Sequence, residues 1–193
     1  MKKKEDFIGV SQREYCPFIR EKSEELLLRL LKDQNPESIL EIGTFLGYSA
    51  SLMLENCPQA SLVTVEKNSS NAEFAKQNLQ NFEERVRIEN CDAMQFLEAN
   101  CDMRFDFIFL DGPKGQYVKY LPFLKKMLKI GGVLVADDVL FYGLVNSDEK
   151  IDHKHRALVN NLRKFLYEIQ NDDDFETIIY DFDDGISVSR KIK

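Results

Sequence analysis

Two adjacent aspartates follow an apolar stretch in the segment GGVLVADDVLFYG. Asp137 and Asp138 come directly after residues that are typical of a strand buried on both faces. A third carboxylate, Asp111, ends the preceding apolar run in FLDGPKGQY. Carboxylates placed side by side repel one another unless a cation neutralises them, and Mg²⁺ or another hard divalent ion prefers such oxygen ligands. The pattern predicts a metal site at Asp111, Asp137 and Asp138, although Asp138 could instead cap a helix and Asp111 could simply belong to a turn.

Lys114 stands three residues after Asp111 and is a candidate catalytic residue. A dication beside a lysine disfavours the ammonium form and moves the pKa of that lysine toward the working pH. Such a lysine can take a proton from a hydroxyl group held at the metal. Taken alone, Lys114 would be an ordinary surface lysine.

Apolar strands and amphipathic helices alternate along the chain and must position these residues. Strands are expected over residues 38–43, 61–66, 85–90, 105–111 and 131–137. Helices are expected over residues 18–33, 48–57, 69–82, 93–100, 116–129 and 154–170. The alternation predicts an α/β fold, a mostly parallel sheet with helices on both faces. FETIIYDF and GISVSRKI, joined by an Asp-Asp-Gly turn, predict a terminal hairpin, and residues 140–154 are expected to form a surface loop.

The bulk properties favour one globular domain over residues 1–193, with residues 1–16 as an N-terminal extension. No apolar stretch reaches the roughly 18 residues that a membrane helix needs, so no membrane partner is expected. The four cysteines show no metal-binding spacing and indicate reduced thiols of a cytoplasmic protein. The net charge of −7 argues against nonspecific coating of nucleic acid, although it leaves room for a local basic surface.

Ligands of open α/β sheets bind outside the carboxyl ends of the strands. That rule places Glu41, Glu66, Asn90, Asp111 and Asp137 along one edge of the sheet. Four of these five strand ends are acidic, which solubility alone would not select. The edge is therefore the candidate functional site.

The turn EIGTFLGYS follows the first strand and opens a helix, as the turns of nucleotide sites do. Gly43 and Gly47 permit a tight turn and a close approach of a ligand to the backbone. A dinucleotide site would carry G-x-G-x-x-G and hold a pyrophosphate, which the carboxylate of Glu41 would repel. Glu41 suits a cation such as the amino group and sulfonium of S-adenosylmethionine, unless it is an incidental residue of the turn. A nicotinamide-dependent dehydrogenase is disfavoured.

Glu66 ends the second strand and can accept hydrogen bonds from two ribose hydroxyls. Sites for NAD and for S-adenosylmethionine share this requirement. Asp92 and Ala93 follow the third strand, where an adenine edge would lie. Asp92 could equally be the N-cap of the next helix.

Together, EIGTFLGYS, Glu66, FLDGPKGQY and VADDVL resemble the metal-dependent O-methyltransferases related to catechol O-methyltransferase. The resemblance runs from about Pro17 to the terminal hairpin and implies a seven-stranded Rossmann-like methyltransferase fold whose last strand is antiparallel. It implies Lys114 and Asp111 as catalytic residues, and a metal on Asp111, Asp137 and Asp138. It places S-adenosylmethionine against Ile19, Glu41, Gly43, Ser49, Glu66, Asp92, Ala93 and Asp111. Two departures are Asp138, where many members have Asn, and Cys91, where Gly is common.

DGPKGQY, DDVLFYGLV and HKHRALVNNLRKF are most similar to the bacterial branch that methylates 5-hydroxyuridine at the wobble position of tRNA. The vicinal 5-hydroxyl and 4-carbonyl of that base can chelate a metal as catechol does. This resemblance implies a tRNA anticodon loop as partner, and the basic residues expected to contact it are Lys150, Lys154, Arg156, Arg163 and Lys164.

Two alternatives stay open. One is an O-methyltransferase of a small catechol or hydroxycinnamoyl-type compound, which would use the same edge of the sheet. The other is a noncatalytic S-adenosylmethionine-binding module, which leaves the set of Asp111, Lys114, Asp137 and Asp138 unexplained. Members of the family are often homodimers, and the resemblance implies the same here.

Overall fold

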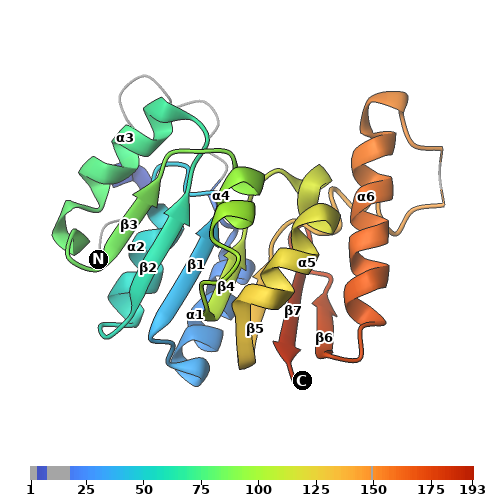
Figure 1. Cartoon of the computed structure of the whole chain (residues 1–193). Helices are drawn as coiled ribbons and strands as arrows, with labels where there is room; N and C mark the ends of the chain where they lie inside the picture. Colours follow the sequence, from blue (N-terminus) through green and yellow to red (C-terminus); the bar gives the residue numbers. More distant parts are fainter. Residues whose placement is uncertain (1–3, 8–17, 149) are drawn as a thin grey trace.

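Seven strands form a single sheet in the order β3-β2-β1-β4-β5-β7-β6 (Figure 1). In the computed structural model, residues 4–7, 18–148 and 150–193 are described. The strands are Ser38–Ile42 (β1), Ser61–Val65 (β2), Val86–Glu89 (β3), Phe105–Leu110 (β4), Leu128–Ala136 (β5), Phe175–Tyr180 (β6) and Ile186–Lys191 (β7). β1 to β5 pair in parallel, whereas β7 is antiparallel to both β5 and β6. The expected seven-stranded fold with an antiparallel last strand is confirmed.

The helices agree with the sequence pattern to within a few residues. The α-helices are Glu21–Gln34 (α1), Tyr48–Asn56 (α2), Ser69–Asn78 (α3), Ala93–Ala99 (α4), Tyr117–Met127 (α5) and His153–Gln170 (α6). Short 3₁₀ turns cover Lys4–Phe7 (η1), Gln80–Phe82 (η2) and Lys114–Gln116 (η3). The helix expected over 69–82 therefore ends as an α-helix at Asn78 and continues as a 3₁₀ turn. Most of the expected N-terminal extension, including Cys16, lies outside the described residues.

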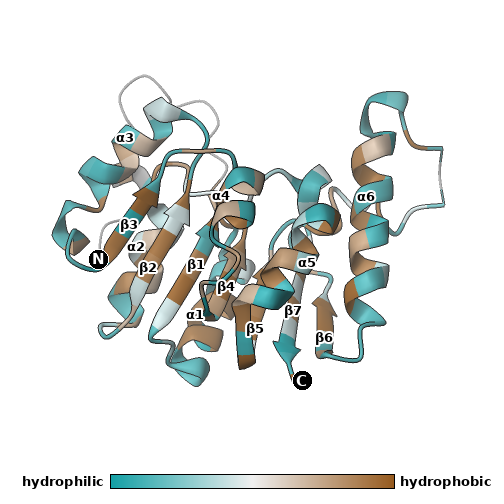
Figure 2. Ribbon diagram, in the orientation of Figure 1, coloured by the Kyte–Doolittle hydropathy of each residue, from teal (hydrophilic) through white to brown (hydrophobic). Residues whose placement is uncertain are grey.

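Helices cover both faces of the sheet, and the apolar strands lie between them. α4, α5 and α6 pack on one face, around residues such as Phe96, Leu124 and Phe165. α1 and α2 pack on the other face, around residues such as Leu27 and Leu52. Figure 2 shows the hydrophobic strands at the centre and hydrophilic residues on the outer surfaces of the helices. None of the described helices is long and apolar enough to cross a membrane.

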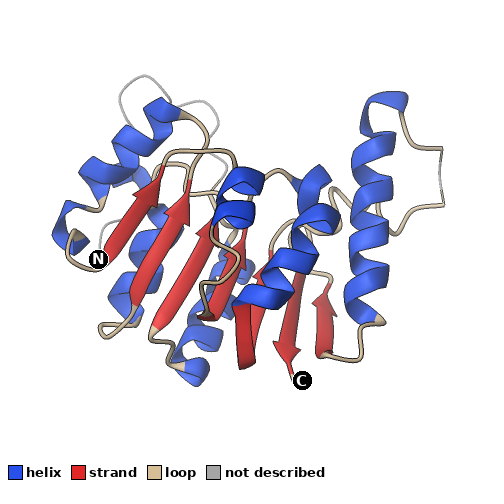
Figure 3. Ribbon diagram, viewed as in Figure 1, coloured by secondary structure: helices blue, strands red, loops and turns tan. Residues whose placement is uncertain are grey.

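The carboxyl ends of the parallel strands meet at one edge of the sheet, toward which the arrowheads of β1 to β4 point in Figure 3. The Asp183–Asp184–Gly185 turn lies at the same edge, because β6 runs in the direction of β1 to β5 and β7 runs back. The loop after β5 bonds to this turn: the N–H of Val139 donates to the carbonyl of Gly185 at 2.9 Å. The antiparallel strand thus brings a turn from the end of the chain to the carboxyl edge.

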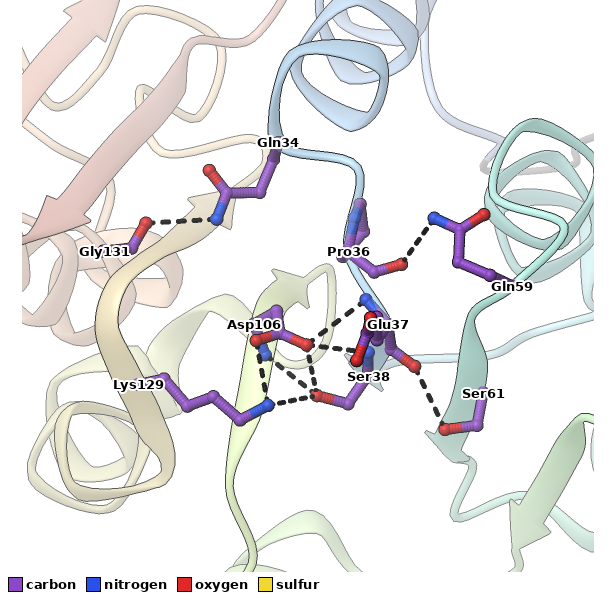
Figure 4. Close-up of polar contacts among 9 residues, drawn as sticks. All are labelled: Gln34, Pro36, Glu37, Ser38, Gln59, Ser61, Asp106, Lys129 and Gly131. Atoms are coloured by element: carbon purple, nitrogen blue, oxygen red, sulfur yellow. Dashed lines mark hydrogen bonds and ion pairs between the residues drawn. The ribbon is translucent and has the colours of Figure 1, made fainter.

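Asp106 organises the opposite edge of the sheet, where it joins three strands (Figure 4). Its Oδ2 accepts hydrogen bonds from the backbone N–H and the hydroxyl of Ser38, at 2.9 and 2.7 Å, and from the N–H of Glu37. Its Oδ1 lies 2.9 Å from Nζ of Lys129 in β5. Burial raises the pKa of Asp106, but the hydrogen bonds from Lys129 and Ser38 outweigh burial and hold it below the usual 3.8.

Replacing Asp106 with Ala should lower the free energy of unfolding by about 1–3 kcal/mol, because the donors of Ser38 and Glu37 lose their acceptor. The folded-state pKa is depressed, so the contribution of Asp106 is complete above its unfolded-state pKa and is lost as the pH falls through its folded-state pKa. Urea unfolding of parent and variant should therefore show a constant difference from pH 7 to about pH 4 and a smaller one below it.

Lys129→Ala is the matched control. Its side chain is 43% exposed, so its ion pair should contribute less than about 1 kcal/mol. An equal loss in the two variants would show that the ion pair, rather than the backbone and hydroxyl hydrogen bonds, joins these strands.

Candidate active site

Two neighbouring cavities open at the carboxyl edge and share three residues. The first, of about 320 Å³, lies over the ends of β1 to β4 and is named here the cofactor cavity. The second, of about 340 Å³, lies between the start of α1 and the loop after β5 and is named the acceptor cavity. Asp111, Lys114 and Asp138 line both. A group bound in one cavity can therefore meet a group bound in the other at these side chains.

Most of the residues predicted to hold S-adenosylmethionine are brought together. Gly43, Glu66, Asp92, Ala93 and Asp111 line the cofactor cavity. A small recess beside it is bordered by Ile19, Ser49, Gly43 and Asp111. Sequence reasoning did not single out Phe45, Lys67 and Tyr120, which also line the cofactor cavity. Phe45 lies within EIGTFLGYS, whereas Lys67 and Tyr120 belong to none of the motifs.

Gly43 allows the first turn to approach the end of β4. Its φ of +106° is in the left-handed region, and a Cβ at this position would lie 2.3 Å from the carbonyl oxygen of Asp111. Any side chain at this position would push the strand ends apart. The glycine thus places the backbone of this turn against Asp111.

Glu41 is fully buried and reaches the recess through Ser49. Oε1 of Glu41 accepts a hydrogen bond from Oγ of Ser49 at 2.5 Å, and its Oε2 accepts one from the hydroxyl of Thr64. Burial raises the pKa of Glu41 to about 7, although both hydroxyls favour the charged form. A buried carboxyl with two hydroxyl donors and no cationic partner among the described residues fits a ligand that carries a positive charge.

Glu66 is held by the backbone on both sides. Its Oε2 accepts the N–H of Phe45 at 2.9 Å and its Oε1 accepts the N–H of Asn68 at 2.7 Å. The carboxylate is thereby fixed at the wall of the cofactor cavity, with lone pairs left for further donors. Asp92 caps α4 through the N–H of Met94 at 2.9 Å, so its interpretation as an N-cap is confirmed. Asp92 also lines the cavity, and its contact with the adenine stays a prediction.

Lys114 lies between two of the three candidate metal ligands. Its Nζ hydrogen-bonds to Oδ1 of Asp111 and lies 3.3 Å from Oδ2 of Asp138. The side chain is only 16% exposed, so Lys114 is not an ordinary surface lysine. Burial lowers its pKa, but the charges of Asp111 and the neighbouring aspartates outweigh burial and raise the pKa well above the usual value. The lowering expected from the sequence requires the charge of a dication.

Asp137 is the most buried of the three aspartates. Its Oδ1 accepts the N–H of Asp138 at 2.9 Å. Burial, together with the charges of Asp111 and Asp138, raises the pKa of Asp137 to about 7. Asp138 has a φ of +55° and is followed by turns and no helix, so the alternative of an N-cap is wrong.

The donor set fits a divalent cation in its chemistry, but its side chains do not converge as they stand. Within residues 4–7, 18–148 and 150–193, no three carboxylate, thiol or imidazole groups are arranged to hold a metal ion. The ammonium of Lys114 lies between Asp111 and Asp138, within salt-bridge distance of both. Three aspartates around one lysine leave an excess of negative charge that a dication would offset.

The loop after β5 forms one wall of the acceptor cavity and is held in an unusual conformation. Phe141 and Tyr142 line the cavity with φ values of 42° and 55°. Asp184 accepts the N–H of Tyr142 at 3.2 Å through its side chain and the N–H of Leu140 at 2.8 Å through its carbonyl. A Cβ on Gly185 would lie 2.2 Å from Leu140. Sequence reasoning treated Asp184 only as part of a turn, although a turn after β6 had to lie at this edge.

The residues expected to contact RNA do not form one free basic surface. Lys150, which precedes α6, and Lys154 and Arg156, in its first turn, are exposed. Arg163 instead donates to the carbonyls of Leu144, Val145 and Ser147 and holds the loop, and Lys164 lies 3.6 Å from Glu168. Lys125 and Lys126 of α5 and Lys129 of β5 also lie within salt-bridge distance of carboxylates.

Comparisons with known proteins place this architecture in a defined class. The caffeoyl-CoA O-methyltransferase of Populus kitakamiensis is 29% identical over 175 residues, which cover 86% of this chain and 74% of the relative. The catechol O-methyltransferase of Bos taurus is 26% identical over 178 residues, covering 88% and 65%. A further match is the crystal structure of the O-methyltransferase TomG from Streptomyces achromogenes, involved in tomaymycin synthesis, in complex with SAM. Its TM-score is 0.79 at 26% identity, and the match covers 91% of this chain and 82% of TomG.

Fold and site define an S-adenosylmethionine-dependent methyltransferase. The chain belongs to the O-methyltransferase family, whose match covers residues 12–192. Its relation to catechol O-methyltransferase is confirmed, and the alternative of a noncatalytic module is set aside.

Replacing Glu66 with Ala should weaken the binding of S-adenosylmethionine by roughly 1.5–3 kcal/mol, because hydrogen bonds to a charged acceptor are lost. Calorimetric titration of parent and variant measures this difference directly. Glu73→Ala, on the exposed side of α3, is the control and should bind like the parent. Unchanged affinity of Glu66→Ala for S-adenosylmethionine would show that Glu66 does not contact the ribose.

Proposed function

We propose that this protein transfers a methyl group from S-adenosylmethionine to a hydroxyl group of an acceptor that carries two neighbouring oxygens, with the help of a divalent cation. The observation that carries this proposal is the set of Asp111, Lys114 and Asp138 shared by the two cavities. The methyl donor and the acceptor hydroxyl must meet where those cavities meet.

Asp111, Asp137 and Asp138 are the residues that would hold the cation. S-adenosylmethionine supplies an electrophilic methyl group, and Mg²⁺ supplies a Lewis acid that lowers the pKa of the acceptor hydroxyl. The chain itself contributes orientation: Tyr117 donates from its hydroxyl to the carbonyls of Leu110 and Asp137, at 3.1 and 3.3 Å, and ties the ends of β4 and β5 together. Fixed ligands bring the reacting oxygen into line with the methyl group.

Lys114 is the residue that moves the proton. Among three aspartates it stays protonated, and an ammonium group cannot accept a proton. Lys114 would lose its proton more readily if Asp111, Asp137 and Asp138 held a dication, because the added positive charge disfavours the ammonium form. The amine then accepts the proton of the acceptor hydroxyl at the shared wall of the cavities.

The acceptor that the comparisons favour is a small catechol or hydroxycinnamoyl-type compound. The relatives named above are a caffeoyl-CoA and a catechol O-methyltransferase. The aromatic rings of Phe18, Phe141 and Tyr142 line the acceptor cavity and suit a planar ring with two vicinal oxygens.

Wobble 5-hydroxyuridine in tRNA is a second candidate acceptor, because its vicinal oxygens pose the same demand. One observation favours it: the exposed Lys150, Lys154 and Arg156 belong to a segment that contacts the wall of the acceptor cavity through His155. His155 of the same segment contacts the ring of Phe141, with ring centroids 5.4 Å apart. Arg163 already donates to carbonyl groups of the loop, so the exposed Lys150, Lys154 and Arg156 are the residues proposed to contact phosphates.

Asp137→Ala and Asp138→Ala should each lower the rate of methyl transfer by at least about a hundredfold. The affinity for S-adenosylhomocysteine should stay largely intact. EDTA should act in the same way on the parent, and added Mg²⁺ should restore its rate. Asp138→Asn keeps an oxygen ligand and should retain most of the activity, which makes it the matched control. Full activity after dialysis against EDTA would contradict the requirement for a cation.

The acceptor is tested by comparing kcat/KM for a small catechol with that for an anticodon stem-loop that carries 5-hydroxyuridine. We expect efficient turnover of the catechol, and no effect on it from the double variant Lys154→Ala, Arg156→Ala. If tRNA is the acceptor, each lost phosphate contact removes about 0.7 from the slope of log affinity against log salt, so the double variant flattens the slope by roughly one unit or more. Turnover of the stem-loop alone would establish the second candidate.

A further inference from the structure

Arg20 is a second cation in the acceptor cavity, and the proposed reaction does not use it. It precedes α1 and lines the cavity together with Phe18, Tyr142 and Asp184. Its Nη2 lies 2.5 Å from Oδ2 of Asp184, a residue 164 positions away in the sequence. The sequence offered no motif for this pairing.

The partner of Arg20 is itself fixed in place. The side chain of Asp184 is 8% exposed, and its Oδ1 accepts the N–H of Tyr142. The preceding residue, Asp183, accepts the N–H and the hydroxyl of Ser23 at the start of α1, at 2.9 and 3.3 Å. These contacts fix the turn, and Asp184 in that turn holds the guanidinium of Arg20 through one nitrogen.

The remaining donors of Arg20 are available to a ligand. A guanidinium has five N–H donors, and Asp184 is its only hydrogen-bond partner among the described residues. The side chain of Arg20 is 41% exposed. Lys114, the other cation of the cavity, is committed to Asp111 and Asp138. A planar group with free donors matches the two oxygens of a carboxylate or a phosphate.

We propose that Arg20 is a specificity-determining residue that binds an oxyanion of the acceptor, at a position other than its two vicinal oxygens. The inference rests on the proposed function, because it assumes that the acceptor occupies this cavity. The oxyanion is a carboxylate if the acceptor is a phenolic acid, and a phosphate if it is a nucleotide. In either case the enzyme prefers an anionic acceptor over its neutral counterpart.

The test uses two matched pairs of acceptors with the full-length protein, S-adenosylmethionine and Mg²⁺. The first pair is 3,4-dihydroxyphenylacetate and its amide, and the second is 5-hydroxyuridine 5′-monophosphate and 5-hydroxyuridine. The parent should prefer the anion by about tenfold or more in kcat/KM in at least one pair, the effect of a hydrogen bond to a charged group. A preference in the first pair alone identifies a carboxylate, and in the second alone a phosphate.

Arg20→Gln should reduce that preference to near unity, and Arg20→Lys should retain part of it. Asp184→Asn is the control: it removes the charge of the partner but leaves the guanidinium in the cavity, so the preference should persist or increase. A preference that is absent in the parent, that survives in Arg20→Gln, or that falls equally in Asp184→Asn would overturn the proposal. The last of these results would show that the ion pair only holds the turn.

The same four compounds are also titrated calorimetrically in the presence of S-adenosylhomocysteine and Mg²⁺. The preference is then measured as a ratio of dissociation constants even if no compound is methylated. Binding that depends on Arg20 without methylation would contradict the proposed acceptor class and support the role of Arg20. Equal binding of the anion and the neutral compound by the parent would contradict the role of Arg20 and would leave the proposed acceptor class untouched.

Discussion

The mutual repulsion of three aspartates at the ends of two neighbouring strands is the constraint on which the site depends. β4 and β5 run in parallel and deliver Asp111 and Asp137 to the same edge, and Asp138 follows at once. Water screens these charges poorly because Asp137 is buried, and its pKa accordingly rises to about 7. The ammonium of Lys114 supplies one of the compensating charges that such a cluster needs. A second positive charge would neutralise the negative charge of the aspartates that Lys114 leaves uncompensated.

Backbone strain is concentrated where this cluster lies. Among the described non-glycine residues with positive φ, only Asn35, at the end of α1, lies away from this edge of the sheet. Phe45, Asp138, Phe141 and Tyr142 all border one of the two cavities. Conformations of this kind cost about 1–3 kcal/mol each and persist only where surrounding contacts impose them. The turn at Asp184 and the hydrogen bonds of Glu66 are such contacts.

The strands, the parallel sheet and the acidic edge could be predicted because each depends on local pattern: apolar runs, helical periodicity and carboxylates where a run ends. The contact of Lys114 with both Asp111 and Asp138 could not, since it depends on how a short loop folds back over the next strand end. Arg20 and Asp184 meet across 164 positions, which no local pattern encodes. Arg163 looked like a ligand for phosphate because composition does not show that carbonyl groups of the preceding loop already accept its donors.

The proposed reaction requires that a dication can replace the ammonium of Lys114 as the counter-charge of Asp111 and Asp138. Calorimetric titration of Mg²⁺ into the protein saturated with S-adenosylhomocysteine tests it most directly, with parent and Lys114→Met compared at constant pH. Removing the competing ammonium should tighten the binding of Mg²⁺ in the variant, since the aspartates then lack their internal counter-charge. Weaker or unchanged binding of Mg²⁺ in Lys114→Met would contradict this exchange of counter-charges.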